Sequence, residues 1–449
     1  MVLTFSVDNR KHAARILVPT RSALAGELYP EGDPISMNKR AKFSLAIFVL
    51  GLIIQFSPAQ SQTPTQPLTR PRTVTTQTTQ PTSKTQTVSQ TPTTATLPAA
   101  QTAGAIMAQQ PWRPLSMNKL RARLDEAKRI LKSKPALTAM TAPDLSIVTL
   151  AVLDEKSSQI HLVKIPKDDF LHKGAQMNLT SSLGMNIQLT IIRANGVNTA
   201  VTAFDAATGR TLVPLVVEYP IERGGALHEM AYYTSAHPAL LSPDVVKTGQ
   251  AYVHMMLDLA ARRLRDKGVP IPSNIVDIAE RLCVVEHTDH TRFRVENRQA
   301  LFEEILSLYA LNELDTFRHS VSFAGAGGMV QMIPSTYQML RREHPGIGLN
   351  PDFVYGMQNH GNALEAMLLY MLDTWKLLTT DADITAALSS GTATLPELMA
   401  AGYNSNPAKL GSYIRRGGSG WRTLIPRETQ TYLQVYHSLE TLIPMKSRS

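Results

Sequence analysis

The sequence has 449 residues, of which 43% are hydrophobic and 18% are charged, as in an ordinary soluble globular protein. Its formal net charge of +9 at pH 7 favours a polyanionic partner, but charge alone does not distinguish nucleic acid, anionic lipid and acidic cell-wall polymer. The single cysteine, Cys283, excludes an internal disulfide and a metal site of several thiolates, and its apolar neighbours predict that it is buried.

Residues 37–59 have the three-part layout of a secretory signal peptide. Basic residues lie between Met37 and Lys42, the apolar run 43–56 follows, and Ser57-Pro58-Ala59 supplies small residues for a cleavage site. The apolar run is shorter than the roughly 20 residues that a transmembrane helix needs, although an uncleaved anchor that tethers the chain to a membrane remains the alternative. The sequence therefore predicts export to the periplasm or the cell envelope.

Two further segments flank the predicted signal peptide. Residues 1–36 are interpreted as a misassigned start, with Met37 as the natural first residue, or as a short extension. Residues 60–111 consist almost wholly of Gln, Thr, Pro, Ser and Ala, with no acidic or aromatic residue. Such a segment cannot bury enough apolar surface to offset its chain entropy, so we predict a disordered linker that serves as a tether or as a mere spacer.

Residues 112–242 predict a small, mostly β domain. Apolar residues at helical spacing predict an amphipathic helix over 117–131, and segments rich in β-branched residues then predict four to six antiparallel strands. Asn195-Gly196 between two apolar alternations predicts a β-hairpin. The predicted strands cover 146–153, 159–165, 187–193, 197–204 and 212–219. We find no site in this domain, which could bind a protein partner or a glycan, or could merely pack.

Residues 243–449 predict a compact, all-helical C-terminal domain. Gly268, with prolines at 270 and 272, ends the first predicted helix. The predicted helices cover 245–267, 274–287, 298–313, 335–344, 360–377 and 428–442. The expected fold class is therefore α+β: a disordered N-terminal tail, a small antiparallel β domain, and an all-helical domain.

Glu313 lies where the predicted helix 298–313 ends, on a face that carries Leu301, Ile305 and Leu308. The helix dipole disfavours a carboxylate at this end, and apolar neighbours would desolvate it. Both effects would raise its pKa, as a general acid at neutral pH requires. The glycines of 325–328 then allow close backbone approach before a new helix begins at Pro334.

Two later blocks add polar groups. Residues 401–407 contain Tyr403 and Asn404, whose phenol and amide could orient a carboxylate or an acetamido group. Residues 425–432 open a helix with Glu428, where the dipole favours a carboxylate. Either block alone would be read as a turn or a helix start.

In this order the three blocks resemble the soluble lytic transglycosylase domain, which has a goose-type-lysozyme-like fold. That family has a Glu nine residues before a Ser, then Gly-Ala-x-Gly-Leu-Met-Gln, a Met-Pro-Ser/Thr helix start, a later Ala-Tyr-Asn-Ala-Gly-Pro, and a final Glu-Thr-x-x-Tyr. The resemblance covers about 300–442, and the matching residues are Glu313, Ser322, Gly325, Ala326, Gly328, Gln331, Pro334, Tyr403, Asn404, Pro407, Glu428, Thr429 and Tyr432. The departures are Leu314 in place of Ser, Met329-Val330 in place of Leu-Met, and Asn406 in place of Gly.

The resemblance implies a lysozyme-like helical domain that cleaves peptidoglycan glycan strands without a cofactor or a metal, and no nucleic-acid partner. Glu313 would be the catalytic acid and base, and Ser322, Gln331, Tyr403 and Asn404 would bind substrate. The acid would protonate the oxygen between MurNAc and GlcNAc and later accept the proton of the C6 hydroxyl, which closes a 1,6-anhydro ring. Tyr403 could also hold the carboxyl of Glu313.

Two other functions remain open from the sequence. A lysozyme-like hydrolase of the same fold would leave a reducing sugar, and a non-catalytic glycan-binding protein would bind strands without turnover. Residues 286–290, Glu-His-Thr-Asp-His, look like a metal cluster, but we favour a polar helix end, because neighbouring ligands alone rarely complete a tetrahedral site.

Overall fold

The computed structural model describes residues 115–133, 144–322 and 324–448, which all belong to one compact unit. The predictions for 1–36, 37–59 and 60–111, including the membrane tether through 43–56, lie outside the described residues. Within the described part, no helix is both long enough and apolar enough to cross a lipid bilayer.

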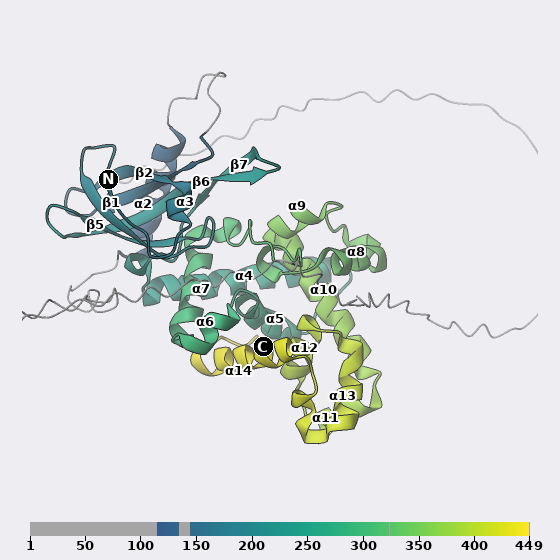
Figure 1. Ribbon diagram of the computed structural model, residues 1–449. Coiled ribbons are helices and arrows are strands. Elements are labelled where there is room, and N and C mark those ends of the chain that lie inside the picture. The colour runs from purple at the N-terminus through teal and green to yellow at the C-terminus, as the bar shows by residue number, and fades with distance from the viewer. Residues whose placement is uncertain (1–114, 134–143, 323, 449) are drawn as a thin grey trace, which may run out of the picture. The chain divides into compact units, whose positions relative to one another are not determined.

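The first half of the described chain forms a curled antiparallel half-barrel of seven strands (Figure 1). The strand order is β2-β1-β6-β5-β4-β3, and β7 pairs with the second half of the long strand β6. The strands are β1 Ile147–Asp154, β2 Gln159–Pro166, β3 Gln176–Thr180, β4 Asn186–Arg193, β5 Ala200–Asp205, β6 Thr211–Arg223 and β7 Ala226–Tyr233. Helix α2 (Met117–Lys132) precedes the sheet, and the single turn α3 (Lys167–Phe170) follows β2.

Both faces of the sheet are buried along β1 and most of β6, where successive side chains point to opposite faces and nearly all are covered. In β1, Val148, Leu150 and Val152 belong to one hydrophobic core, whereas Ala151 and Leu153 belong to a second one. The second core is covered by the apolar stripe of α2, which lies against β1 and β6 (Figure 1). The buried residues of that stripe are Leu120, Leu124, Ala127 and Leu131.

The two outer strands of the curled sheet meet at one end. The Leu162 carbonyl in β2 accepts a hydrogen bond of 2.8 Å from the Ser182 amide, which lies just after β3. Ser182 Oγ in turn accepts a hydrogen bond of 3.0 Å from the Leu162 amide, and His161 Nδ1 lies 3.0 Å from Ser181 Oγ. These contacts occupy backbone groups that an open sheet would leave unpaired at its edges.

The second half of the described chain is helical. Its longest helices, α4 and α10, contact each other, and α5 contacts both of them (Figure 1). Helix α12 contacts α10, and α14 packs against α5, α7 and α12. The α-helices are α4 Pro243–Asp266, α5 Ser273–Val285, α6 His290–Val295, α7 Arg298–Asn312, α8 Pro334–Glu343, α9 Phe353–Gln358, α10 His360–Thr379, α11 Ala382–Ser389, α12 Leu395–Asn404, α13 Leu410–Gly417 and α14 Arg427–Leu442. Helices α4 and α7 approach closely because Gly249 has no side chain: a Cβ there would lie 1.8 Å from the Leu306 carbonyl oxygen.

Helix α7 joins the helical part to the sheet. Leu308 packs into the core on the concave side of the sheet, and Leu311 packs into the core beneath α2. The buried side chain of Asn312 accepts a hydrogen bond from the Thr234 amide and donates one to the Thr234 carbonyl, both at 2.8 Å. The sheet and the helices therefore share their cores through α7.

The expected fold class is wrong as stated. We expected a small β domain of four to six strands followed by a separate, lysozyme-like, all-helical domain. The sheet instead has seven strands, and it forms one compact unit with the helices, with which it shares two hydrophobic cores. The sheet does precede the helices along the chain, and the division at 242/243, between β7 and α4, stays a prediction.

Individual elements follow the sequence patterns closely. Strands β1, β2 and β4 and helices α4, α5, α7, α8, α10 and α14 begin and end near their predicted residues. The predicted hairpin at Asn195-Gly196 joins β4 and β5, but its connection is longer than two residues. Strands β3 and β7 and helices α3, α6, α9, α11, α12 and α13 were not predicted from the sequence. The side chains of β3 alternate only between exposed and partly exposed, so that strand gives no strong hydrophobic signal.

Candidate active site

Glu313 lies immediately after α7, as predicted, but its surroundings differ from the prediction. Its side chain is 52% exposed, and its Oε1 accepts a hydrogen bond of 2.8 Å from Arg121 of α2. The expected desolvation by apolar neighbours is therefore wrong. Glu313 lines neither the cleft among the helices nor the cleft between the sheet and the helices.

The sequence blocks converge elsewhere, in a cleft of about 530 Å³ that we call the acid cleft. The predicted substrate-binding residues Ser322, Gln331, Tyr403 and Asn404 all line the acid cleft. Glu428 and Tyr432 of α14 also line it. The structure thus brings together residues from all three blocks, which are up to about a hundred positions apart in the sequence, but with a different carboxyl group among them.

That carboxyl group belongs to Glu286, which directly follows α5 and lines the acid cleft. Its Oε1 accepts a hydrogen bond of 2.5 Å from the hydroxyl of Tyr432, which is 2% exposed. Burial raises the pKa of Glu286 from its ordinary 4.5 to about 8, against the Tyr432 hydrogen bond, which lowers it, while the charge of Glu428 raises it further. Glu286 is therefore mostly protonated at neutral pH and can donate a proton.

The glycine-rich loop of the first block lies against this helix end. His287 Nε2 lies 3.1 Å from the Met329 carbonyl oxygen, and the His287 ring stacks on Phe317 with 3.4 Å between ring centroids. Burial lowers the pKa of His287 to about 3, so the ring is neutral and can donate from Nε2 to the carbonyl. Gly328 fits here because its φ is +67° and a Cβ would lie 2.2 Å from the Met357 carbonyl oxygen.

Strained backbone is concentrated in the segment 313–331, which includes the glycine-rich loop. Glu313, Phe317 and Gln331 have φ of 48°, 56° and 45°, positive values that residues other than glycine rarely adopt. Gln331 Nε2 donates to the Gly328 carbonyl at 2.8 Å and to Ser320 Oγ at 3.2 Å, which fixes the amide beside the cleft. Such strain persists where surrounding contacts over-determine the backbone, and it is common at functional sites.

The other predicted binding residues are held by hydrogen bonds to the protein. Tyr403 donates to the Val330 carbonyl at 2.7 Å, so it supports the glycine-rich loop instead of holding Glu313 as we expected. Asn404 Oδ1 accepts a hydrogen bond of 2.8 Å from Thr429 Oγ1, which joins the second and third blocks. Ser322 Oγ accepts a hydrogen bond of 3.0 Å from the Ala326 amide.

A local sequence pattern also marks Glu286, but the spacing of the three blocks favoured Glu313. Glu286 follows the apolar run Leu282–Val285 at the end of a helix, which is the same pattern that drew attention to Glu313. We had interpreted 286–290 as a polar helix end. In the structure this segment contains both the cleft carboxyl and Asp289, which caps α6 by accepting hydrogen bonds from the Thr291 and Arg292 amides.

The raised pKa of Glu286 predicts a pH-dependent stability. A folded pKa of about 8 lies above the ordinary 4.5, so the protonated group favours the folded state. This contribution is fully present below pH 4.5 and is lost as the pH rises to about 8. We expect Glu286→Gln, which cannot ionise, to gain stability relative to the wild type over this window, by up to about 1.4 kcal/mol per pH unit. Urea unfolding at several pH values measures the difference, and parallel curves for the two proteins would contradict the raised pKa.

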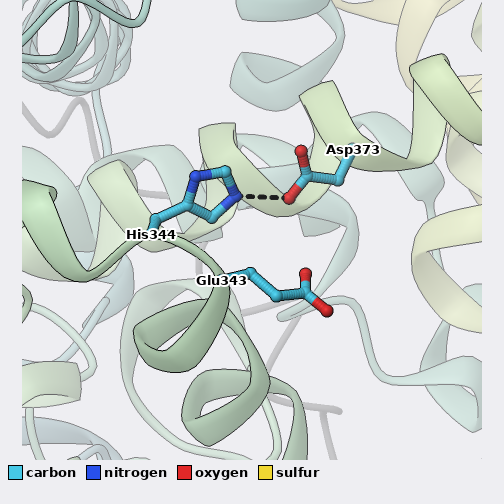
Figure 2. A group of neighbouring side chains, drawn as sticks. All are labelled: Glu343, His344 and Asp373. Carbon is cyan, nitrogen blue, oxygen red and sulfur yellow. Dashed lines mark hydrogen bonds and ion pairs between the residues drawn. The ribbon is translucent and has the colours of Figure 1, made fainter. Parts of the chain in front are cut away.

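A separate cluster could offer ligands to a metal ion. Figure 2 shows His344 and Asp373 pointing toward one another, with Glu343 beside them, and the three ligand atoms lie within 4.8 Å of one another. His344 Nε2 is 2.6 Å from Asp373 Oδ2, and Lys376 Nζ is 3.5 Å from Asp373 Oδ1. The cluster joins the end of α8 to α10 through the ion pair of His344 with Asp373. Its residues line neither the acid cleft nor the cleft beside the sheet.

Comparison with known proteins adds no relative: no family model, no curated protein and no solved structure matches this chain.

Proposed function

We propose that this protein cleaves the glycan strands of peptidoglycan as a lytic transglycosylase, with Glu286 as its acid and base. The observation that carries the proposal is the acid cleft, where a carboxyl group with a pKa of about 8 lies among residues of all three sequence blocks. The sequence resemblance is defined by those blocks without reference to Glu286. Their convergence on a proton donor is therefore independent support for the chemistry.

Glu286 would first donate its proton to the oxygen that bridges MurNAc and GlcNAc, and the bond between C1 and this oxygen would break. The acetamido group of the substrate would stabilise the positive charge at C1. The Glu286 carboxylate would then accept the proton of the C6 hydroxyl, whose oxygen bonds to C1 and closes the 1,6-anhydro ring. The proton is back on Glu286 at the end, and no water is consumed.

The neighbours of Glu286 suit both halves of this cycle. Desolvation keeps the carboxyl protonated before the first step. The Tyr432 hydroxyl, whose own pKa is raised far by burial, remains a donor and stabilises the carboxylate that forms when the proton leaves. Tyr403 and Gln331 hold the glycine-rich loop beside the cleft, and Asn404 could bind the acetamido group of a sugar.

A hydrolase is the second candidate, and one observation favours it. Glu428 is an exposed second carboxylate that lines the same acid cleft. A pair of carboxyl groups is what most glycoside hydrolases use, one as acid and the other as base or nucleophile. In that case water would add to C1, and the product would carry a reducing end.

Digestion of purified peptidoglycan by the purified full-length protein tests the proposal, with mass spectrometry of the released fragments. We expect fragments that end in 1,6-anhydro-MurNAc. Fragments with a reducing end would establish the hydrolase instead. Release of no fragments, despite binding to the strands, would contradict both enzymes and leave a glycan-binding protein.

A further inference from the structure

A second cleft, of about 850 Å³, lies between the sheet and the helices, and we call it the sheet cleft. We propose that the sheet cleft is the second half of the substrate groove and binds the polysaccharide on the other side of Glu286 from the acid cleft. The inference rests on the proposed function and extends it, because it gives the seven-stranded sheet a role in binding substrate.

The two clefts adjoin at the carboxyl group. Glu286, Thr288 and Gln331 line both of them. A polymer whose scissile bond lies at Glu286 must extend away from that residue in two directions. One arm of the polymer would lie in the acid cleft, and the other arm would lie in the sheet cleft. Each volume lies within the range of about 300–1,000 Å³ that is usual for ligand sites.

The walls of the sheet cleft come from parts of the chain far apart in sequence. The turn between β4 and β5, residues 194–198, and Ile221 of β6 form one wall, while Phe317 and Ser320 belong to the segment opposite. The side chain of Asn195 is exposed at this turn, so it is free to meet a ligand. Ser320 Oγ accepts the hydrogen bond from Gln331, which connects this wall to the acid cleft.

The charges in the sheet cleft select the class of ligand. Arg193 and Arg292 both pair with the carboxylate of Glu304, Arg292 pairs also with Glu296, and Lys167 pairs with Glu222, so the three cations have three carboxylates as partners. Because these cations are already neutralised by carboxylates, the cleft offers little net attraction to phosphate groups or nucleic acid. It offers amide and hydroxyl groups instead, from Asn195, Asn198 and Ser320 among others. An uncharged chain of N-acetylated amino sugars fits this chemistry.

The test measures how affinity depends on glycan length. The full chain carrying Glu286→Gln, which should bind without turnover, is titrated by calorimetry with chitin oligosaccharides of about three and about six sugars. We expect the longer oligosaccharide to bind about tenfold more tightly or better, because it reaches both clefts. Asn195→Trp, which places an indole in the sheet cleft, should reduce this ratio to about one or two. Ala207→Trp, on the exposed turn between β5 and β6 and outside both clefts, should leave the ratio unchanged.

The outcomes separate this inference from the proposed function. Equal affinities for the two lengths, or a ratio that survives Asn195→Trp, would overturn the sheet cleft as a binding site while peptidoglycan cleavage stands. Absence of binding to either oligosaccharide, together with absence of turnover, would overturn both proposals. Asn195→Ala, a smaller change at the same exposed position, provides a second variant if Asn195→Trp fails to fold, and we expect it to lower the ratio partly.

Discussion

Replacement of Glu286 by glutamine should reduce the release of glycan fragments by about 10³-fold or more, because the variant has no proton to donate to the bridging oxygen. Glutamine keeps the size of the side chain and can still accept the hydrogen bond from Tyr432, which is 2.5 Å in the wild type. The fold should therefore be retained, and circular dichroism checks this. The initial rate of release of soluble fragments from purified peptidoglycan measures the effect.

Glu313→Gln is the matched control, and it also decides between the two carboxyl groups. Glu313 is the acid that the sequence motif predicts, whereas its side chain is half exposed and paired with Arg121. If Glu286 is the acid, Glu313→Gln should keep most of the activity and lose only an exposed ion pair, which contributes about 0–1 kcal/mol. The reverse result, with Glu313→Gln inactive and Glu286→Gln active, would contradict the assignment to the acid cleft.

Replacement of Asn312 by alanine should lower the free energy of unfolding by about 2–5 kcal/mol. The side chain of Asn312 satisfies both the amide and the carbonyl of Thr234, and all of these groups are buried. Alanine would leave two buried backbone groups without partners at the junction between the sheet and α7. Because this junction also lies beside Glu313 and the strained segment that leads to the clefts, activity should fall as well. Urea unfolding followed by circular dichroism measures the loss of stability.

Gln299→Ala provides the comparison on the same helix. Its exposed side chain donates a hydrogen bond to Glu303 one turn later, so its loss should change the free energy of unfolding by no more than about 0.5 kcal/mol. An Asn312→Ala variant as stable as Gln299→Ala would contradict the view that the sheet and the helices are coupled through α7. Two separate unfolding transitions in the wild type would contradict it as well.

Local sequence patterns predicted most of the secondary structure. The alternation of β-branched residues placed β1 and β2, and the helical spacing of apolar residues placed α2, α4 and α10, because these patterns record which side chains must be buried. The pattern could not reveal that β1 and β6 are covered on both faces, since some of the residues that cover them belong to α7. The predicted independence of the β part failed for this reason: Leu308 and Leu311 of α7, which pack into its two cores, come about 75 residues after the last strand.

For the candidate site as well, the sequence predicts individual residues, and the tertiary structure determines their surroundings. The sequence by itself predicted residues that line the acid cleft, including Gln331, Tyr403 and Asn404, because the three blocks have a recognisable order. It also supplied two helices, α5 and α7, that each end in an apolar run followed by a glutamate. Their local signals are equivalent: the helix dipole acts on both carboxyl groups in the same way. Only the tertiary structure distinguishes them: burial beside the acid cleft raises the pKa of Glu286 to about 8, whereas Glu313 is turned to solvent and to Arg121.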